Sequence, residues 1–392
     1  MNPDLWLKKF YKNEVFSGNF EHLKQLVSRL ELFPEQSQII TVAGTNGKGQ
    51  TIRLLNRILV SHQKRCLLWT SPHLFSVLER FQLNSQNIDV RELSEIFLLL
   101  EKKLNELNVR ISYFEFLFLS FLMWAKTVKP DYLLLEVGLG GRLDAVNTLD
   151  ADYCLLTSIG RDHQDILGHR LEEILAQKVG VFRKKTYVIS SLELDYLRKK
   201  TGQHAQKVSC EWQDLFDLGL LSKSDHFSKR NFLLAKYLAE KILKQPLNEL
   251  DFKDFMSARY TAKLRGVNVV FFPSHNIDGL RKLVQFLKQA KYTNDISLLV
   301  SFSDRSASEL RVMMKILLKN FKRNKIWLYQ YSHFKAISEE KLTAIANENK
   351  LKVVNDKTLF ELFKEEEKEL LVTGSNYFLS QFDVSLQRIG RR

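Results

Sequence analysis

The chain has 392 residues, of which 45% are hydrophobic and 27% are charged. This length favours two domains, with three as the alternative, and this composition argues against wholesale disorder. The formal net charge of +14 attracts anionic ligands, but the basic residues are spread along the chain without a dense basic arm or a nucleic-acid-binding signature. The charge alone therefore does not identify the partner, although we expect no nucleic acid.

The cysteines and the apolar segments indicate the cellular compartment in which the chain works. Cys66, Cys154 and Cys210 are widely spaced and form no CxxC pair, which argues against a disulfide framework or a zinc site and fits a reducing compartment. The N-terminus lacks the basic and apolar regions of a signal peptide. The most apolar stretch, 113–125, is too short to span a membrane. We expect a cytoplasmic monomer without a membrane partner.

Strand and helix patterns alternate through the first part of the chain. Apolar runs predict strands at 38–43, 65–69, 131–138 and 151–159, and helical spacing of apolar residues predicts helices around 51–63, 90–107 and 112–126. This alternation predicts a parallel α/β sheet whose functional groups gather at the carboxyl ends of the strands.

A second alternating set begins near residue 267. It predicts strands at 269–272, 297–302, 325–329 and 369–372, and helices at 279–289, 308–318, 339–347 and 359–366. The fold class is therefore α/β, with a P-loop-type, mostly parallel sheet domain followed by a smaller Rossmann-like domain. We place the domains at 1–262 and 267–392, with the boundary between Ala262 and Gly266.

A glycine-rich turn, Gly44-Thr45-Asn46-Gly47-Lys48-Gly49-Gln50-Thr51, joins the first strand to the first helix. Its backbone N–H groups, its lysine and the helix N-terminus suit phosphate binding. The strict Walker pattern is not met, because Val42 stands at its first glycine position and Gly49 follows the lysine. An ordinary strand-to-helix turn is the alternative.

Polar side chains follow three other predicted strands. Glu136 interrupts an apolar run and leads into Gly138–Asp144, His163 follows the strand at 151–159, and Ser71 follows the strand at 65–69. Mg²⁺ bound to a nucleotide needs only one or two protein oxygens, which Glu136 could supply. The alternatives are a salt bridge for Glu136 and a structural role for His163.

Several motifs in this order resemble one family. GTNGKG, SPHL…ER, YFEFL, EVGLGGRLDAVN, SIGRDHQDILG and QKVGVF resemble the folylpolyglutamate synthase / dihydrofolate synthase family of the Mur ligase superfamily, over roughly residues 15–380. The resemblance implies ATP-dependent addition of L-glutamate to dihydropteroate or to (poly)glutamylated folate through an acyl phosphate. It implies ATP and Mg²⁺ as cofactors, with two ions and with Mn²⁺ as an alternative metal.

The resemblance also implies site residues. Asn46, Gly47, Lys48 and Gly49 would hold the ATP phosphates, with Asn231 and Arg259 as further nucleotide contacts. Ser71, Glu136 and His163 would bind metal. Lys178 would be a carbamylated lysine, whereas its local sequence reads as a solvated helix lysine. The substrate-binding positions would be Ser112, Tyr113, Phe114, Glu115, Leu143, Asp144, Ala145 and Asp304, and His275 would take part in catalysis with Lys178 and Lys48.

Two positions depart from the family pattern. Gln50 replaces the serine of GTNGKGS, and Phe272 replaces an aspartate that would accept a hydrogen bond from the nucleotide. Two alternatives therefore stay open beside the ligase. They are a non-catalytic homologue that binds nucleotide or folate, and a Mur-type ligase with another carboxylate substrate.

Overall fold

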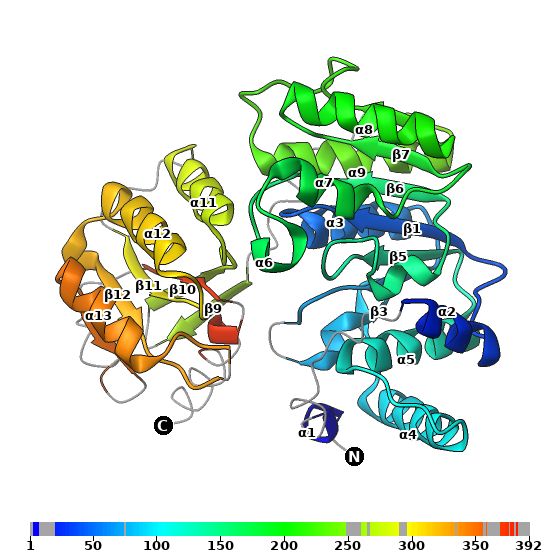
Figure 1. The fold of residues 1–392 in the computed structure, drawn as a ribbon, viewed down its shortest axis with the longest axis horizontal. Helices are drawn as coiled ribbons and strands as arrows, with labels where there is room; N and C mark the ends of the chain where they lie inside the picture. Colours follow the sequence, from blue (N-terminus) through cyan, green and yellow to red (C-terminus); the bar gives the residue numbers. More distant parts are fainter. Residues whose placement is uncertain are drawn as a thin grey trace. The chain divides into compact units, whose positions relative to one another are not determined.

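The computed structural model describes residues 3–7, 20–73, 76–247, 260–264, 267–289, 296–333, 335–355, 358, 369–375, 377–379 and 382. The chain divides into two compact units, Met1–Phe252 and Lys253–Arg392. Figure 1 shows that each unit has a central sheet flanked by helices.

The first unit contains an eight-stranded sheet in the order β4-β3-β2-β5-β1-β6-β7-β8. The six strands β2, β5, β1, β6, β7 and β8 pair in parallel, and β3 pairs antiparallel with both β2 and β4. The strands are β1 (Gln38–Ala43), β2 (Cys66–Trp69), β3 (Phe81–Leu83), β4 (Gln86–Asn87), β5 (Tyr132–Glu136), β6 (Tyr153–Leu156), β7 (Tyr187–Ser190) and β8 (Glu211–Asp214). The carboxyl ends of β1, β2, β5 and β6 therefore meet at one edge.

Helices connect these strands and cover the sheet (Figure 1). Helix α3 follows the phosphate turn and packs against β1, β2, β5 and α9. The helices are α1 (Pro3–Trp6), α2 (Phe20–Arg29), α3 (Lys48–Ser61), α4 (Val90–Glu106), α5 (Tyr113–Val128), α6 (Gln164–Leu167), α7 (Leu171–Val179), α8 (Asp195–Val208) and α9 (Phe227–Leu243), with 3₁₀ turns η2 (Val77–Arg80) and η3 (Ala145–Thr148).

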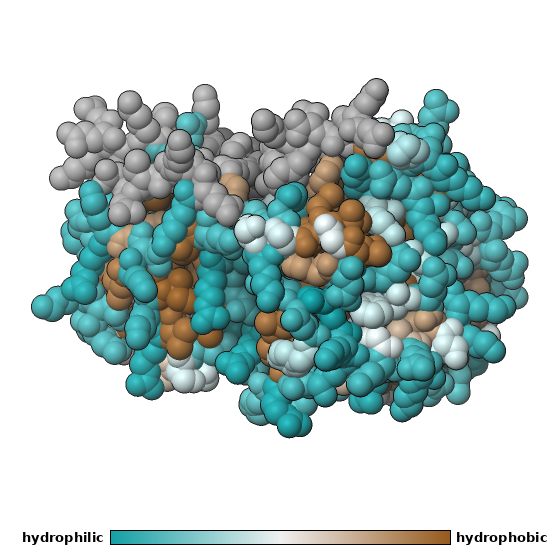
Figure 2. Space-filling view, turned by 90° about the horizontal axis from the view of Figure 1, so that it is seen from above, coloured by the Kyte–Doolittle hydropathy of each residue, from teal (hydrophilic) through white to brown (hydrophobic). Residues whose placement is uncertain are grey.

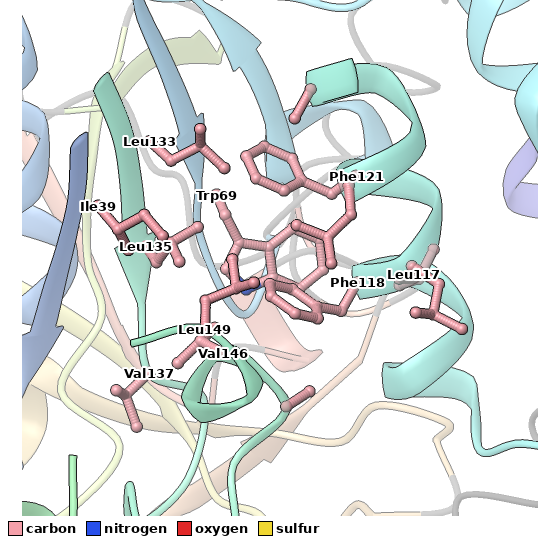
Figure 3. Close-up of a cluster of buried hydrophobic side chains, with 14 of the residues drawn as sticks. Ile39, Trp69, Leu117, Phe118, Phe121, Leu133, Leu135, Val137, Val146 and Leu149 are labelled. Atoms are coloured by element: carbon pink, nitrogen blue, oxygen red, sulfur yellow. The ribbon is translucent and has the colours of Figure 1, made fainter. Parts of the chain in front are cut away.

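Aromatic side chains of α5 fill one face of the sheet (Figure 3). Trp69 at the end of β2 is fully buried, and its ring centroid lies 5.6 Å from that of Phe118 and 5.5 Å from that of Phe121. Leu133 and Leu135, two residues apart on β5, belong to the same cluster. Because side chains alternate along a strand, Glu136 points to the opposite face, toward α3.

The described residues of the second unit form a six-stranded sheet in the order β13-β12-β11-β14-β10-β9, and among these strands only β9 is antiparallel. Its strands are β9 (Tyr260–Leu264), β10 (Val267–Phe272), β11 (Ser297–Ser301), β12 (Ile326–Tyr329), β13 (Lys352–Val354) and β14 (Glu369–Gly374). Its described helices are α11 (Ile277–Gln289), α12 (Ala307–Asn320) and α13 (Glu339–Asn349).

The α/β fold class expected from the sequence is confirmed. Strand β1 has the predicted bounds, and the other predicted strands and described helices occur with ends shifted by a few residues. The division of the chain falls at Phe252, and β9 already pairs with β10, whereas the sequence analysis placed the boundary between Ala262 and Gly266. The roles assigned to the two domains remain predictions, and the predicted helix at 359–366 lies outside the described residues.

None of the helices in the described ranges combines the length and the apolar character needed to cross a membrane. The face shown in Figure 2 is mostly hydrophilic, with hydrophobic side chains in separate patches.

Replacing Phe121 by alanine tests the aromatic core. Phe121 is fully buried against Trp69, Phe81 and Phe118, so Phe121→Ala should destabilise the first unit by about 3–5 kcal/mol. Hydrogen exchange of the β5 amides in the full chain measures this loss. Leu98→Ala on α4, where the leucine is 52% exposed, is the control and should change stability by less than about 0.5 kcal/mol. Equal effects of the two changes would contradict the assignment of the core.

Candidate functional site

Two glycines give the turn between β1 and α3 its shape. Gly44 has φ +145° and Gly47 has φ +94°, a region that side chains other than glycine rarely adopt. A Cβ on Gly44 would lie 2.0 Å from Oγ1 of Thr157, and a Cβ on Gly47 would lie 2.6 Å from the amide of Asn231. The turn therefore needs glycine at both positions for conformation and for space.

The carboxyl end of β6 holds the same turn in place. The backbone N–H of Thr45 donates to the carbonyl of Ser158 at 2.7 Å. The hydroxyls of Thr157 and Ser158 donate to the carbonyl of Asn46 at 2.8 and 2.9 Å. The sequence analysis did not select Thr157 and Ser158, although two hydroxyl residues directly after a buried strand are a usable signal.

Lys48 begins α3 and turns back over the turn. Its Nζ donates to the carbonyls of Gly44 and Thr45 at 3.1 and 3.3 Å. No side chain caps the N-terminus of α3, so the positive end of the helix dipole lies beside the charge of Lys48. This arrangement is chemically suited to a phosphate group.

Glu136 ends β5 as a buried carboxylate that is 5% exposed. Burial raises the pKa of its carboxyl, while the positive charges of Lys48 and Arg53 and a hydrogen bond from Ser71 lower it. The backbone N–H of Ser71 donates to Oε2 of Glu136 at 3.0 Å. A Cβ on Gly49 would lie 3.3 Å from both carboxylate oxygens, so the carboxylate directly adjoins the phosphate turn.

The hydroxyl of Ser71 is compatible with a metal ligand. Its Oγ is buried and has no hydrogen-bond partner, and the same is true of Oγ1 of Thr51 on the first turn of α3, as far as the structure is described. A buried hydroxyl without a hydrogen-bond partner destabilises the fold unless a bound ligand supplies that partner. Ser71 and Glu136 together offer the hard oxygen donors that Mg²⁺ prefers.

His163, the third predicted metal ligand, lies on the loop after β6. It has φ +47° at the start of α6, its side chain is half exposed, and its Nε2 is 3.9 Å from Oδ2 of Asp162. Within the described ranges, no group of three or more His, Cys, Asp or Glu side chains is arranged to hold a metal. The metal-binding role of His163 therefore stays a prediction.

Lys178 on α7 is buried beneath the turn rather than solvated, which corrects the reading of its local sequence. It is 3% exposed, and its Nζ donates to the carbonyl of Gly44 at 2.9 Å. Burial lowers the pKa of this lysine to about 7, and the charge of Lys48 acts in the same direction, while Asp162 and Asp144 oppose the shift. A large neutral fraction at neutral pH makes the amine nucleophilic.

The residues predicted to bind substrate near α5 also build the start of that helix. Ser112 and Glu115 form a capping box, in which the N–H of Ser112 donates to Glu115 at 2.7 Å and the N–H of Glu115 donates to Ser112 at 3.3 Å. Tyr113 is buried, and Phe114 packs on Trp69 with ring centroids 5.7 Å apart. Of these four, the two aromatic side chains are the better candidates for ligand contact.

The segment after β5 turns back toward Phe114. A Cβ on Gly138 would lie 2.8 Å from the Phe114 ring. Asp144 is buried, accepts from the N–H groups of Leu139 and Val146 at 2.8 and 3.1 Å, and burial raises its pKa to about 6. Leu143 is 40% exposed and Ala145 is buried. The predicted segments at 112–115 and 143–145 therefore come together around Phe114.

Arg80 is a buried cation in this region that the sequence analysis did not select. Its Nε donates to Nδ1 of His73 at 2.8 Å. Burial lowers the pKa of His73 to about 3, and Arg80 adds to this. A charged residue within the apolar segment VLERFQL was the available signal.

Asn231 and Gln50 contact each other beside the turn. Asn231 on α9 is 4% exposed, and its Nδ2 donates to Oε1 of Gln50 at 2.7 Å. The residue that departs from the family pattern thus holds one of the predicted nucleotide contacts. Arg259, the other predicted contact, lies outside the described residues.

In the second unit, His275 and Asn276 follow β10. Nδ2 of Asn276 lies 3.3 Å from Nε2 of His275, and its Oδ1 accepts from the N–H of Gly279 at 2.7 Å. Asp304 follows β11 and forms an ion pair with Lys341 at 2.7 Å. Phe272 packs against Phe286 with ring centroids 5.8 Å apart, at the edge of the hydrophobic core of this unit.

The comparisons with known proteins give the fold first. A bifunctional folylpolyglutamate synthase/dihydrofolate synthase solved with Mn, AMPPNP and L-glutamate bound matches 99% of this chain and 98% of its own, with a TM-score of 0.79 and 23% identity. FolC of Escherichia coli, solved with DHPP and ADP, matches 100% and 99%, with a TM-score of 0.79 and 22% identity. The chain therefore has the two-domain fold of these enzymes. No protein-family model matches it.

Sequence identity to curated proteins shows which enzymes this chain resembles. The dihydrofolate synthase/folylpolyglutamate synthase of Buchnera aphidicola (subsp. Acyrthosiphon pisum) is 38% identical over 216 residues, which are 53% of this chain and 52% of that protein. The protein of the same name from Haemophilus influenzae is 40% identical over 184 residues, 47% and 41% of the two chains. The matches thus span about half the length of these relatives. They confirm that the chain is related to the dihydrofolate synthase/folylpolyglutamate synthase family.

The pH dependence of stability tests the buried state of Lys178. A lysine pKa of about 10.5 when unfolded and about 7 when folded means that the unfolded chain binds more protons between these values. The contribution of Lys178 to the free energy of unfolding should therefore rise with pH, by on the order of 3 kcal/mol between pH 7 and 9.5, and should be lost as pH falls toward 7.

The comparison is between the wild-type chain and Lys178→Met, unfolded by urea in CO₂-free buffer at several pH values. Groups other than Lys178 titrate in both proteins and cancel in the difference. A stability difference that stays constant from pH 7 to 9.5 would show that the pKa of Lys178 is not lowered.

Proposed function

We propose that this chain is an ATP-dependent ligase that joins L-glutamate to the carboxylate of dihydropteroate, to the γ-carboxylate of folates, or to both. The observation that carries the proposal is the pair formed by Glu136 and Ser71. A buried carboxylate and a buried hydroxyl without a partner lie beside a turn suited to phosphate. Such a site fits a metal–nucleotide complex.

The names and ligands of the relatives support this choice of reaction. The related structures hold an ATP analogue with Mn and L-glutamate in one case, and DHPP with ADP in the other. The curated relatives carry both synthase names. The described residues fit that chemistry, because the phosphate turn, Glu136 and the aromatic residues around Phe114 lie in one unit.

The chemistry has two steps. An oxygen of the substrate carboxylate attacks the γ-phosphorus of ATP, and the bond to the β-phosphate oxygen breaks. This step releases ADP and forms an acyl phosphate on the substrate. The amino group of glutamate then attacks the acyl carbon, phosphate leaves, and the nitrogen loses a proton. The protein has to position these groups and neutralise their charges. Lys48 and the N-terminus of α3 would do so at the phosphates.

Glu136 and Ser71 would hold Mg²⁺ or Mn²⁺, and His163 would complete the site, with two ions in total. Bound metal would neutralise phosphate charge during the transfer. Lys178 would react with CO₂ through its neutral amine, with formation of an N–C bond and release of a proton, to give a carbamate. His275 and Asp304 of the second unit would serve the glutamate step.

The direct test is glutamate-dependent ADP release. With ATP and Mg²⁺, we expect ADP release that requires both L-glutamate and a carboxylate substrate, either dihydropteroate or tetrahydrofolate. Comparing the two substrates separates a single activity from a bifunctional enzyme. Binding of nucleotide or folate without glutamate-dependent turnover would instead identify a non-catalytic homologue and overturn the ligase proposal.

Lys178→Ala tests the carbamate. Loss of the buried amine should lower ligation at least 100-fold, because the negative group that it would carry is removed. Short carboxylates added to the assay should restore part of the rate by occupying the space. Lys184→Ala, at an exposed lysine near the same helix, is the control and should keep the wild-type rate. Wild-type ligation by Lys178→Ala would disprove the assignment.

A further inference from the structure

Arg80 lies in a box of three aromatic rings. Its guanidinium carbon is 5.9 Å from the ring centroids of both Trp69 and Tyr113 and 6.0 Å from that of Phe114. The residue is 6% exposed. Aromatic faces attract a cation, but they do not neutralise its charge.

The hydrogen bonds of this guanidinium are incomplete. Its Nε–H donates to Nδ1 of His73, so that imidazole nitrogen is an acceptor and His73 supplies no negative charge. Its Nη1 is buried without a partner, and the ion pairs of the described residues include none with Arg80. The charge of Arg80 lowers the pKa of Glu136, but these two residues form no ion pair in the part of the chain that the structure describes. A buried cation whose Nη1 lacks a hydrogen-bond partner is unfavourable, which makes the site receptive to an anionic ligand.

The surroundings indicate which anion fits. Phe114, one wall of the box, also touches the backbone at Gly138, in the segment that follows Glu136 on β5. Trp69, another wall, is followed by Thr70 and Ser71, and Ser71 donates to Glu136. The box thus adjoins the proposed metal and phosphate site. The phosphate turn has its own donors, so the ligand of Arg80 is a different anion.

We propose that Arg80 binds the substrate carboxylate that becomes phosphorylated, while the partly buried Phe114 contacts the aryl ring that bears this carboxylate. The inference rests on the proposed function and adds a binding residue to it. A planar guanidinium can hold a carboxylate by two parallel hydrogen bonds. Its charge would also reduce the repulsion between the carboxylate and the ATP phosphates as they approach.

The test measures discrimination between a carboxylate and its neutral amide. Dissociation constants of dihydropteroate and of its carboxamide are measured by calorimetry for the wild-type chain, Arg80→Gln and Arg80→Lys. The wild type should bind the carboxylate about 10- to 100-fold more tightly than the amide. Arg80→Gln should bring this ratio close to one without weakening the amide, and Arg80→Lys should give an intermediate ratio.

Arg198 provides the matched control. It also lies over an aromatic ring, with its guanidinium carbon 5.4 Å from the centroid of Phe216, but it is paired with Asp195 and Asp217. Arg198→Gln should lower the melting temperature and keep the wild-type ratio of dissociation constants. Arg80→Gln should bind the carboxylate and the amide with nearly equal dissociation constants. Its melting temperature should fall less than that of Arg198→Gln, because no ion pair is broken.

The outcomes separate the two proposals. A wild-type ratio in Arg80→Gln, together with glutamate-dependent ADP release by the wild type, would overturn the role of Arg80 alone. Failure of Arg80→Gln to fold would also overturn it, because the cation would then be required by the fold. No binding of either compound and no ADP release by the wild type would overturn both proposals.

Discussion

The site depends on one carboxylate that is buried at the end of a parallel strand. Glu136 loses most of its hydration in the fold, and burial raises the pKa of its carboxyl. The charges of Lys48 and Arg53 and the N–H of Ser71 favour its ionised form. Keeping a carboxylate in such a position is costly unless something binds to it. The neighbouring Lys48, Arg53 and Ser71 offset part of this cost of burial.

The topology of the sheet explains how distant segments meet at Glu136. Strand β5 lies between β2 and β1, and β6 lies on the far side of β1, with all four parallel. Their carboxyl ends therefore bring together the loop after β2, the phosphate turn after β1 and the hydroxyls after β6. Small residues at 44, 47 and 49 allow the turn to approach its neighbours closely. The aromatic core on the other face of the sheet fixes the strands that carry these ends.

Much of the fold could be predicted from local pattern. The run QIITVA has the bounds of β1, because a strand buried on both faces is apolar throughout. The strands β7 and β8 were not predicted, since β7 has only four residues after a basic stretch and β8 reads Glu-Trp-Gln-Asp. Short or polar strands become visible only when a sheet supplies their neighbours.

The site residues could be predicted from local sequence pattern only in part. Glu136 and the phosphate turn stand out in the sequence, but Lys178 reads as an exposed helix residue. Only tertiary packing places it under the carbonyl of Gly44 and lowers its pKa. Arg80 and its aromatic box likewise depend on side chains from β2, η2 and α5. Whether a charged side chain is buried depends on the folded chain, so a short segment of sequence does not reveal it.

The central claim is that Glu136, with Ser71, holds the divalent metal of a metal–nucleotide complex. Electron paramagnetic resonance of free Mn²⁺ tests it directly, with a non-hydrolysable ATP analogue and either the wild-type chain or Glu136→Gln. The account predicts that the wild type binds the Mn²⁺–nucleotide complex at least about 10-fold more tightly than the variant, because a charged metal ligand is lost. Equal binding of Mn²⁺ by the two proteins in the presence of nucleotide would contradict it.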